Sequence, residues 1–232
     1  MLFLIVSGGM LRSATFLRMY VTAMFIGMCI LLWYIKNFRK QCIAWQDAVL
    51  LSVLAVIGVL THYHIIIFVV FEAAFGGYLI IKKRWKDFVK YFTSLAVAAG
   101  ISSVVFPAML SHIFGTGARG KQAFENLRSG GYGERLKRFL EIISGDLFGR
   151  WETAASAAIL LLICSVLFLM KKLTDNDAKS FAENVICILL PCTGYFLIVS
   201  KTAAYMTGRY IWIIYPMCLY MVFGITYILL RG

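Results

Sequence analysis

The chain has 232 residues, of which 61% are hydrophobic and only 15% charged, and its mean hydropathy is +0.83. A soluble globular domain is about 45–50% apolar and about 25% charged, so a core of this chain's size cannot enclose so much apolar surface. The composition excludes an ordinary soluble domain and predicts an all-α, polytopic integral membrane protein, because the apolar runs do not alternate as barrel strands do.

The amino-terminal segment "MLFLIVSGGML" is too short to cross a bilayer and lacks the basic start of a signal peptide. We therefore expect it to be the outer end of a helix that begins before residue 1. Full spans are then expected in chain order at 14–35, 44–61, 64–81, 91–113, 153–170, 181–200 and 209–230. The prediction is one transmembrane domain over 1–232, with about seven full helices and a partial one.

Basic residues predict which connections between these spans are cytoplasmic. They follow the first, third, fifth and last spans: Lys36, Arg39 and Lys40; Lys82, Lys83, Arg84, Lys86 and Lys90; Lys171, Lys172 and Lys179; and Arg231. The other connections, which include "THYH" (61–64) and a long segment at 114–152, are then extracytoplasmic.

The segment 114–152 is the largest region predicted outside the bilayer. Its first part, "GTGARGKQAFENLRSGGYG", is rich in glycine, and we expect it to be irregular. An amphipathic helix is predicted near 134–148, where apolar residues recur at helical spacing. Such a helix would lie in the plane of the outer membrane interface. Two interpretations remain open, a helix that caps the spans without contacting a substrate and a helix with a functional role.

Several kinds of chemistry are not expected. The net charge of +12 does not indicate nucleic-acid binding, because the basic residues lie in short connections and form no RNA-binding motif. "GTGARG" (115–120) matches a dinucleotide-binding pattern but lacks the strand and helix around it. The six cysteines form no CxxC pair and no zinc pattern, so neither a metal nor another cofactor is predicted.

Polar residues near membrane depth are costly and mark candidate sites. The candidates share a position at the extracytoplasmic ends of the spans: Arg18, Tyr20, His62, Tyr63, His64, Arg209 and Tyr210. A guanidinium can hold phosphate oxygens, and an imidazole can donate a hydrogen bond to them. With Arg12, Arg119, Lys121 and Lys201 they would line one cationic cavity suited to an anion that is partly lipid. Each of them can equally be a structural anchor of a helix end.

Glu72, near the middle of the third expected span, is a further candidate. Small residues surround it, namely Ala73, Ala74, Gly76 and Gly77, and they allow a neighbouring helix to approach closely. We expect Glu72 to face protein, either in a structural hydrogen bond or in contact with a substrate.

Three motifs together resemble those of a known family. "LRMY" (17–20), "THY" (61–63) and "RYIWIIYP" (209–216) are similar to motifs of bacterial membrane glycosyltransferases of the C-type (GT-C) fold. These enzymes are relatives of the protein O-mannosyltransferases and of the lipid A aminoarabinose transferase. The resemblance implies sugar transfer from a polyprenyl-phosphate donor, at the outer face of the bacterial cytoplasmic membrane, by a multi-pass protein. It also implies that the matched arginines and His62 hold the donor phosphate; His64 lies just beyond the match.

The resemblance leaves the catalytic residue unknown. Relatives often have Glu where this chain has Phe16, and the loop that carries their catalytic carboxylate would precede residue 1. We therefore expect an amino-terminally incomplete chain. Five acids lie on the predicted outer side, and none of them is marked as a substitute for the missing carboxylate: Glu125, Glu134, Glu141, Asp146 and Glu152.

Two alternatives to a glycosyltransferase stay open. One is a non-catalytic membrane subunit or an inactive fragment, which the missing carboxylate favours. The other is a transporter or flippase for a lipid or solute, favoured by Glu72 and by kinked spans, although no paired repeats are evident. The sugar and the acceptor are not determined.

Overall fold

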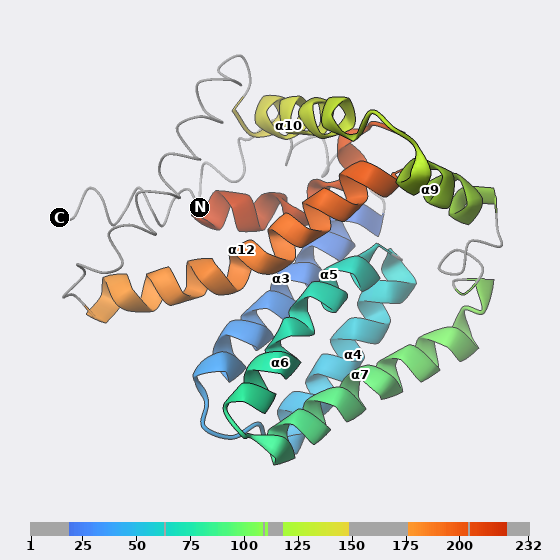
Figure 1. Cartoon of the computed structure of the whole chain (residues 1–232). Helices are drawn as coiled ribbons and strands as arrows, with labels where there is room; N and C mark the ends of the chain where they lie inside the picture. The colour runs from blue at the N-terminus through green and yellow to red at the C-terminus, as the bar shows by residue number, and fades with distance from the viewer. Residues whose placement is uncertain are drawn as a thin grey trace.

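The computed structural model describes residues 19–62, 64–108, 110, 118–148, 176–203 and 205–221, and all regular structure among them is helical (Figure 1). The α-helices are α3 (Met19–Arg39), α4 (Trp45–Thr61), α5 (Ile65–Glu72), α6 (Ala74–Ile81), α7 (Trp85–Val105), α9 (Ala118–Arg128), α10 (Tyr132–Phe148) and α12 (Asn176–Thr202). Two short 3-10 helices follow, η2 (Gly208–Tyr210) and η3 (Trp212–Ile214), and the last runs into a helix that continues to Met221. The all-α class is therefore correct.

Two of the described helices are long and apolar enough to cross a membrane. One is α7, and the other is the part of α3 from Tyr20 to Phe38. The other apolar helices are shorter: Trp45–Thr61, Ile65–Ile81, Ile188–Thr202 and Trp212–Met221. The span expected at 153–170 lies outside the described residues. These helices suggest membrane association, and the seven-span bundle remains a prediction.

The span expected at 91–113 has different bounds in the structure. Its helix α7 begins at Trp85, six residues early, because its polar first turn is held in place: Asp87 is buried and accepts a hydrogen bond of 2.9 Å from the backbone N–H of Ile43. The helix ends at Val105, shortly before Pro107, whose ring disfavours helical backbone in the residue that precedes it.

Aromatic rings pack the interior where α3, α6 and α7 meet. Trp33 stacks on Tyr91 with 5.9 Å between ring centroids, and Phe75 meets both rings edge-on at 6.1 Å and 5.3 Å. On α4, a Cβ at Gly58 would lie 2.9 Å from a methyl carbon of Ile65, so the absence of a side chain there permits the close approach of α5.

The third expected span is divided into α5 and α6 by a turn at Ala73, and the two helices run on in nearly the same direction (Figure 1). The N–H of Ala73 is shared between the carbonyls of Val69 and Val70, which tightens the chain there. Glu72 is only 2% exposed, and its backbone carbonyl accepts a hydrogen bond from the Tyr91 hydroxyl at 3.0 Å. Glu72 therefore faces protein, as expected.

The helices α9 and α10 lie across one end of the bundle, beside α12 (Figure 1). The expectation of irregular structure before residue 134 is wrong for α9, because the glycines flank the helix-forming run "KQAFENLR" rather than interrupting it. The predicted amphipathic helix is α10, and its apolar face packs on the bundle: Phe139 is fully buried and Leu147 is 6% exposed. This packing favours a helix that caps the spans.

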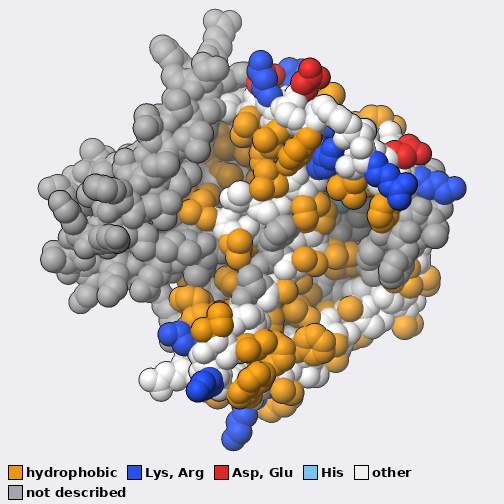
Figure 2. All heavy atoms as spheres, viewed as in Figure 1, with side chains coloured by type: hydrophobic (Ala, Val, Ile, Leu, Met, Phe, Trp, Pro, Cys, Tyr) orange, Lys and Arg blue, Asp and Glu red, His pale blue; other side chains and the backbone are white. Residues whose placement is uncertain are grey.

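The connections between the helices gather at two opposite ends of the bundle. The α3–α4 and α6–α7 connections form one end, which we call the basic end; the α4–α5 connection and the segment 203–210 lie at the other, the histidine end (Figure 1). Figure 2 shows hydrophobic side chains over the visible surface between these ends, with Lys and Arg concentrated toward the ends.

Candidate functional site

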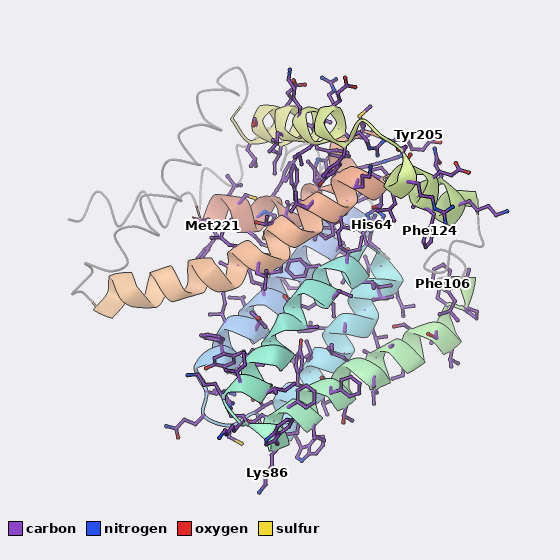
Figure 3. All side chains as sticks on the ribbon, viewed as in Figure 1. His64, Lys86, Phe106, Phe124, Tyr205 and Met221 are labelled. Atoms are coloured by element: carbon purple, nitrogen blue, oxygen red, sulfur yellow. The ribbon has the colours of Figure 1, made fainter. Side chains whose placement is uncertain are left out.

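Five of the predicted site residues meet at the histidine end. The ring of His62 lies 5.2 Å from that of Tyr20 and 5.0 Å from that of His64. His64 in turn stacks on Tyr210 at 5.2 Å, and the guanidinium carbon of Arg209 lies 5.2 Å from the centre of the Tyr210 ring. We call these five residues the His–Tyr–Arg cluster. It joins parts of the chain nearly 190 residues apart in sequence, and His64 lies at the start of α5 (Figure 3).

Backbone groups of both histidines are paired within the short connection that carries them. The N–H of His62 donates to the carbonyl of Gly58 at 2.9 Å, and the carbonyl of His62 accepts from the N–H of Ile65 at 2.9 Å. The N–H of His64 donates to Nδ1 of His62 at 3.3 Å. A tight turn can thus join two apolar helices without leaving these polar groups unpaired.

His62 is electrically neutral in this arrangement. Burial, followed by the nearby positive charge of Arg209, lowers the pKa of His62 to about 4. Its Nδ1 accepts a hydrogen bond, so the ring can donate only through Nε2. The positive charge of the cluster therefore comes from Arg209.

The backbone of η2 presents Arg209 and Tyr210 to the cluster. The hydroxyl of Tyr195, a fully buried residue of α12, donates a 2.7 Å hydrogen bond to the carbonyl of Tyr210. Arg209 is half-buried, forms no ion pair with a described carboxylate, and its Nε has no hydrogen-bond acceptor among the described residues. The positive charge of Arg209 is thus not neutralised within the described part of the chain. A group that binds an anion needs such a charge.

Asp146, on α10, joins the cluster indirectly, and sequence reasoning did not single it out. It is 8% exposed, and its Oδ2 accepts hydrogen bonds from the Tyr215 hydroxyl at 2.7 Å and from Trp212 Nε1 at 3.3 Å. The Trp212 ring lies edge-on to Tyr20 at 5.5 Å. A Cβ at Gly208 would lie 2.7 Å from the same Oδ2, so Asp146 packs directly against the residue that precedes Arg209.

A signal for Asp146 exists in the sequence. It falls seven residues after Phe139, on the apolar face of the predicted helix, where a carboxylate is rarely found without hydrogen-bond donors. The other described acids of this region differ: Glu125 and Glu134 are exposed, and Glu141 pairs with Arg138 at 3.1 Å on the surface. Glu152 lies outside the described residues.

The remaining predicted residues do not complete a cationic cavity within the described part of the chain. Arg12, Arg18 and Tyr63 lie outside the described residues. Lys121 is exposed on α9, where its charge lies in solvent. The ammonium of Lys201 donates to the carbonyl of Ser129 at 2.6 Å and thereby ties α12 to the α9–α10 connection.

No group of three metal-ligating side chains lies together among the described residues. Comparison with protein-family models, with curated proteins and with solved structures found no match for this chain. The functional interpretation therefore depends on the cluster itself and on the motifs that supply it.

Proposed function

We propose that this chain is a multi-pass GT-C glycosyltransferase, which moves a sugar from a polyprenyl-phosphate donor to an acceptor at the extracytoplasmic face of the membrane. One observation carries the proposal. Each of the "LRMY", "THY" and "RYIWIIYP" motifs supplies at least one residue to the His–Tyr–Arg cluster, although the motifs are far apart in the sequence. These residues are Tyr20, His62, Arg209 and Tyr210. Motifs that serve one ligand are expected to converge in this way.

The sidedness of the cluster supports an extracytoplasmic reaction. The cluster lies at the end opposite the basic end, and excess Lys and Arg mark cytoplasmic connections. Two apolar helices long enough to span support a membrane location, as does the hydrophobic surface between the ends. We further propose that the membrane is the bacterial cytoplasmic membrane and that the protein crosses it about seven times.

In the proposed reaction, the acceptor oxygen bonds to the anomeric carbon of the sugar as the bond from that carbon to the phosphate oxygen breaks. The electron pair stays on the phosphate, whose added negative charge the Arg209 guanidinium stabilises. The neutral imidazole of His62 donates a further hydrogen bond through Nε2. The acceptor proton passes to a base that we do not assign. Asp146 is a positioning residue, since it accepts hydrogen bonds from Trp212 and Tyr215 and packs against Gly208.

Binding of polyprenyl phosphate by the purified chain tests the site without requiring a complete catalytic apparatus. We expect Arg209→Ala to weaken this binding by roughly 100-fold or more, the effect of removing one charge-stabilising group. Where sugar transfer is measurable, its rate should fall by a similar factor. The matched control is Arg138→Gln, because Arg138 is a surface arginine paired with Glu141. Unchanged binding by Arg209→Ala would exclude the site.

A second candidate function is transport, favoured by the turn at Ala73. A buried carboxylate beside an interrupted helix is typical of ion or substrate sites in transporters. Oε1 of Glu72 has no hydrogen-bond partner among the described residues. Movement of a polyprenyl-phosphate sugar across liposomes, abolished by Glu72→Gln and not by Arg209→Ala, would favour this function over glycosyl transfer.

A further inference from the structure

The basic end contains two buried carboxylates whose charges are already balanced. Asp47 pairs with Lys40 at 2.5 Å, and Asp87 pairs with the guanidinium of Arg84 at 2.7 Å. Lys36 and Lys90 approach the same carboxylates at 3.8 Å and 4.0 Å. The Asp87 carboxylate also accepts from the backbone N–H of Ile43 at 2.9 Å, and the ammonium of Lys90 donates to the Ile43 carbonyl at 2.6 Å. These two contacts join the α6–α7 connection to the α3–α4 connection.

Three further lysines at this end have no such role. Lys82, Lys83 and Lys86 are exposed and form no ion pair with a described carboxylate, and Lys86 extends away from the bundle (Figure 3). Together with the four cations named above, they make seven basic side chains against two carboxylates, an excess of five positive charges. Such an excess attracts a surface of negative charge.

Lys83 occupies a backbone position that ordinarily favours glycine. Its φ is 56°, in the left-handed region. It ends α6 in a Schellman motif: its N–H donates to the carbonyl of Ile80 at 2.9 Å, and the N–H of Arg84 donates to that of Leu79 at 2.8 Å. A lysine here sacrifices backbone stability that glycine would supply, which points to a use for its charge.

Large apolar side chains are exposed beside these lysines. Trp45 and Trp85, at the first positions of α4 and α7, are 60% and 57% exposed, and Ile81 is 78% exposed. Tryptophan is enriched at the level of lipid headgroups, where its ring is apolar and its N–H polar. The ammonium of Lys90 lies 5.8 Å from the centre of the Trp45 ring, so aromatic and cationic groups are adjacent here.

We propose that the basic end is a binding surface for anionic phospholipid headgroups of the cytoplasmic leaflet. Lys82, Lys83 and Lys86 contact the phosphate oxygens, while Trp45 and Trp85 lie among the lipids at the interface. The charge excess and the adjoining tryptophans select a lipid over a soluble anion, because only a bilayer supplies negative charge and an apolar layer together. The proposal rests on the membrane location proposed above and is independent of sugar transfer.

The test compares nanodiscs of phosphatidylcholine with nanodiscs that also contain phosphatidylglycerol. Native mass spectrometry measures which lipid the released protein retains, and we expect wild type to retain phosphatidylglycerol preferentially. In Lys82→Gln/Lys86→Gln the preference should fall roughly fivefold for each lysine removed. The matched control, Arg128→Gln/Lys137→Gln, removes two exposed charges at the opposite end and should keep the wild-type preference.

Lys83→Gly separates charge from backbone strain. In phosphatidylcholine its Tm should rise by about 2–4 °C as the strain is relieved. The additional rise in Tm that phosphatidylglycerol causes should be smaller in Lys83→Gly than in wild type. High salt should reduce this rise in both proteins.

Three results would overturn the inference. The first is an equal loss of the preference for phosphatidylglycerol in Lys82→Gln/Lys86→Gln and in the control double variant. The second is a stabilisation by phosphatidylglycerol that is as large in Lys83→Gly as in wild type. The third is stabilisation of wild type by free glycerol phosphate in phosphatidylcholine nanodiscs. Failure of wild type to enter nanodiscs would overturn it together with the proposed membrane location. By contrast, loss of polyprenyl-phosphate binding alone, with the headgroup preference intact, would leave it standing.

Discussion

The two ends of the helical bundle hold their cations in different ways. At the basic end, Asp47 and Asp87 pair with lysines and an arginine. At the histidine end, Arg209 lies against the ring of Tyr210, and Asp146 accepts hydrogen bonds from the neutral donors Trp212 and Tyr215.

This difference separates structural roles from binding roles. A cation paired with a buried carboxylate has its charge neutralised, so its main effect is on stability. A cation against an aromatic face keeps most of its charge and can bind an anion. Substitutions of the paired groups should therefore lower stability, whereas substitutions in the His–Tyr–Arg cluster should mainly lower ligand binding.

The largest effect on stability is expected at Asp87. Asp87→Ala removes the acceptor for the Ile43 N–H and leaves Arg84 without its carboxylate, and it should lower the free energy of unfolding by about 3 kcal/mol. Unfolding in detergent micelles measures the change. Glu141→Ala, which breaks the exposed pair with Arg138, is the control and should change stability by less than about 0.5 kcal/mol. Equal effects of the two substitutions would contradict the structural role of the basic end.

The next effect concerns the pH dependence of stability at the histidine end. The folded pKa of His62, about 4, is below its ordinary value of 6.5, so between these pH values the unfolded chain binds more protons. His62 should therefore cause a loss of roughly 2–3 kcal/mol of stability as the pH falls from 6.5 to 4, and none above 6.5. Denaturant unfolding at a series of pH values measures this loss. His62→Gln should show a flatter profile, and an unchanged profile would mean that His62 is not buried in neutral form.

A smaller effect tests whether Asp146 acts through Arg209. Asp146→Ala should weaken polyprenyl-phosphate binding about tenfold, because Gly208 and the residues that hold it lose their support. In an Arg209→Ala background the same substitution should have little further effect on binding, since the group that it positions is absent. Additive losses in the double variant would show that Asp146 acts elsewhere. Tyr215→Phe, which removes one donor to Asp146, should have a milder effect than Asp146→Ala.

The smallest effect compares two glycines. A methyl group at Gly208 would meet Asp146 Oδ2 at 2.7 Å, so Gly208→Ala should lower stability by about 1–2 kcal/mol. Gly77, within α6, has no atom within 4 Å of the position of an added Cβ, and Gly77→Ala should raise stability by about 0.5–1 kcal/mol. Thermal unfolding of both variants distinguishes them, and a stabilising Gly208→Ala would contradict the close packing of Asp146.

Much of the helical pattern was predictable because apolar runs and charged connections are local properties. The α4 helix and the α5–α6 pair lie within a residue or two of the expected 44–61 and 64–81. The start of α7 was not predictable, because the contact that secures it joins Asp87 to Ile43, 44 residues away. The α9 helix differs from the prediction because the glycines around 115–120 and 130–133 indicate irregular structure, whereas the run between them forms helix readily.

The residues of the candidate site were likewise predictable only in part. Tyr20, His62, His64, Arg209 and Tyr210 were identified from the motifs and from the cost of polar groups near a membrane. Asp146 was one acid among several, and its importance comes from contacts with Trp212 and Tyr215, 66 and 69 residues away. Tyr195 lies within an apolar run whose pattern does not mark it, although its hydroxyl donates to the carbonyl of Tyr210.

The sequence by itself determined the helical class, the apolar character of the chain and the residue types available for binding an anion, because composition and periodicity act locally. Only the tertiary structure decided that two histidines, two tyrosines and Arg209 meet at one end, with Asp146 supporting them. It also decided that some lysines of the opposite end pair with a carboxylate, whereas others have no such partner among the described residues. These outcomes depend on packing between helices distant in the sequence, and that packing sets which charges are neutralised and which remain available to a ligand.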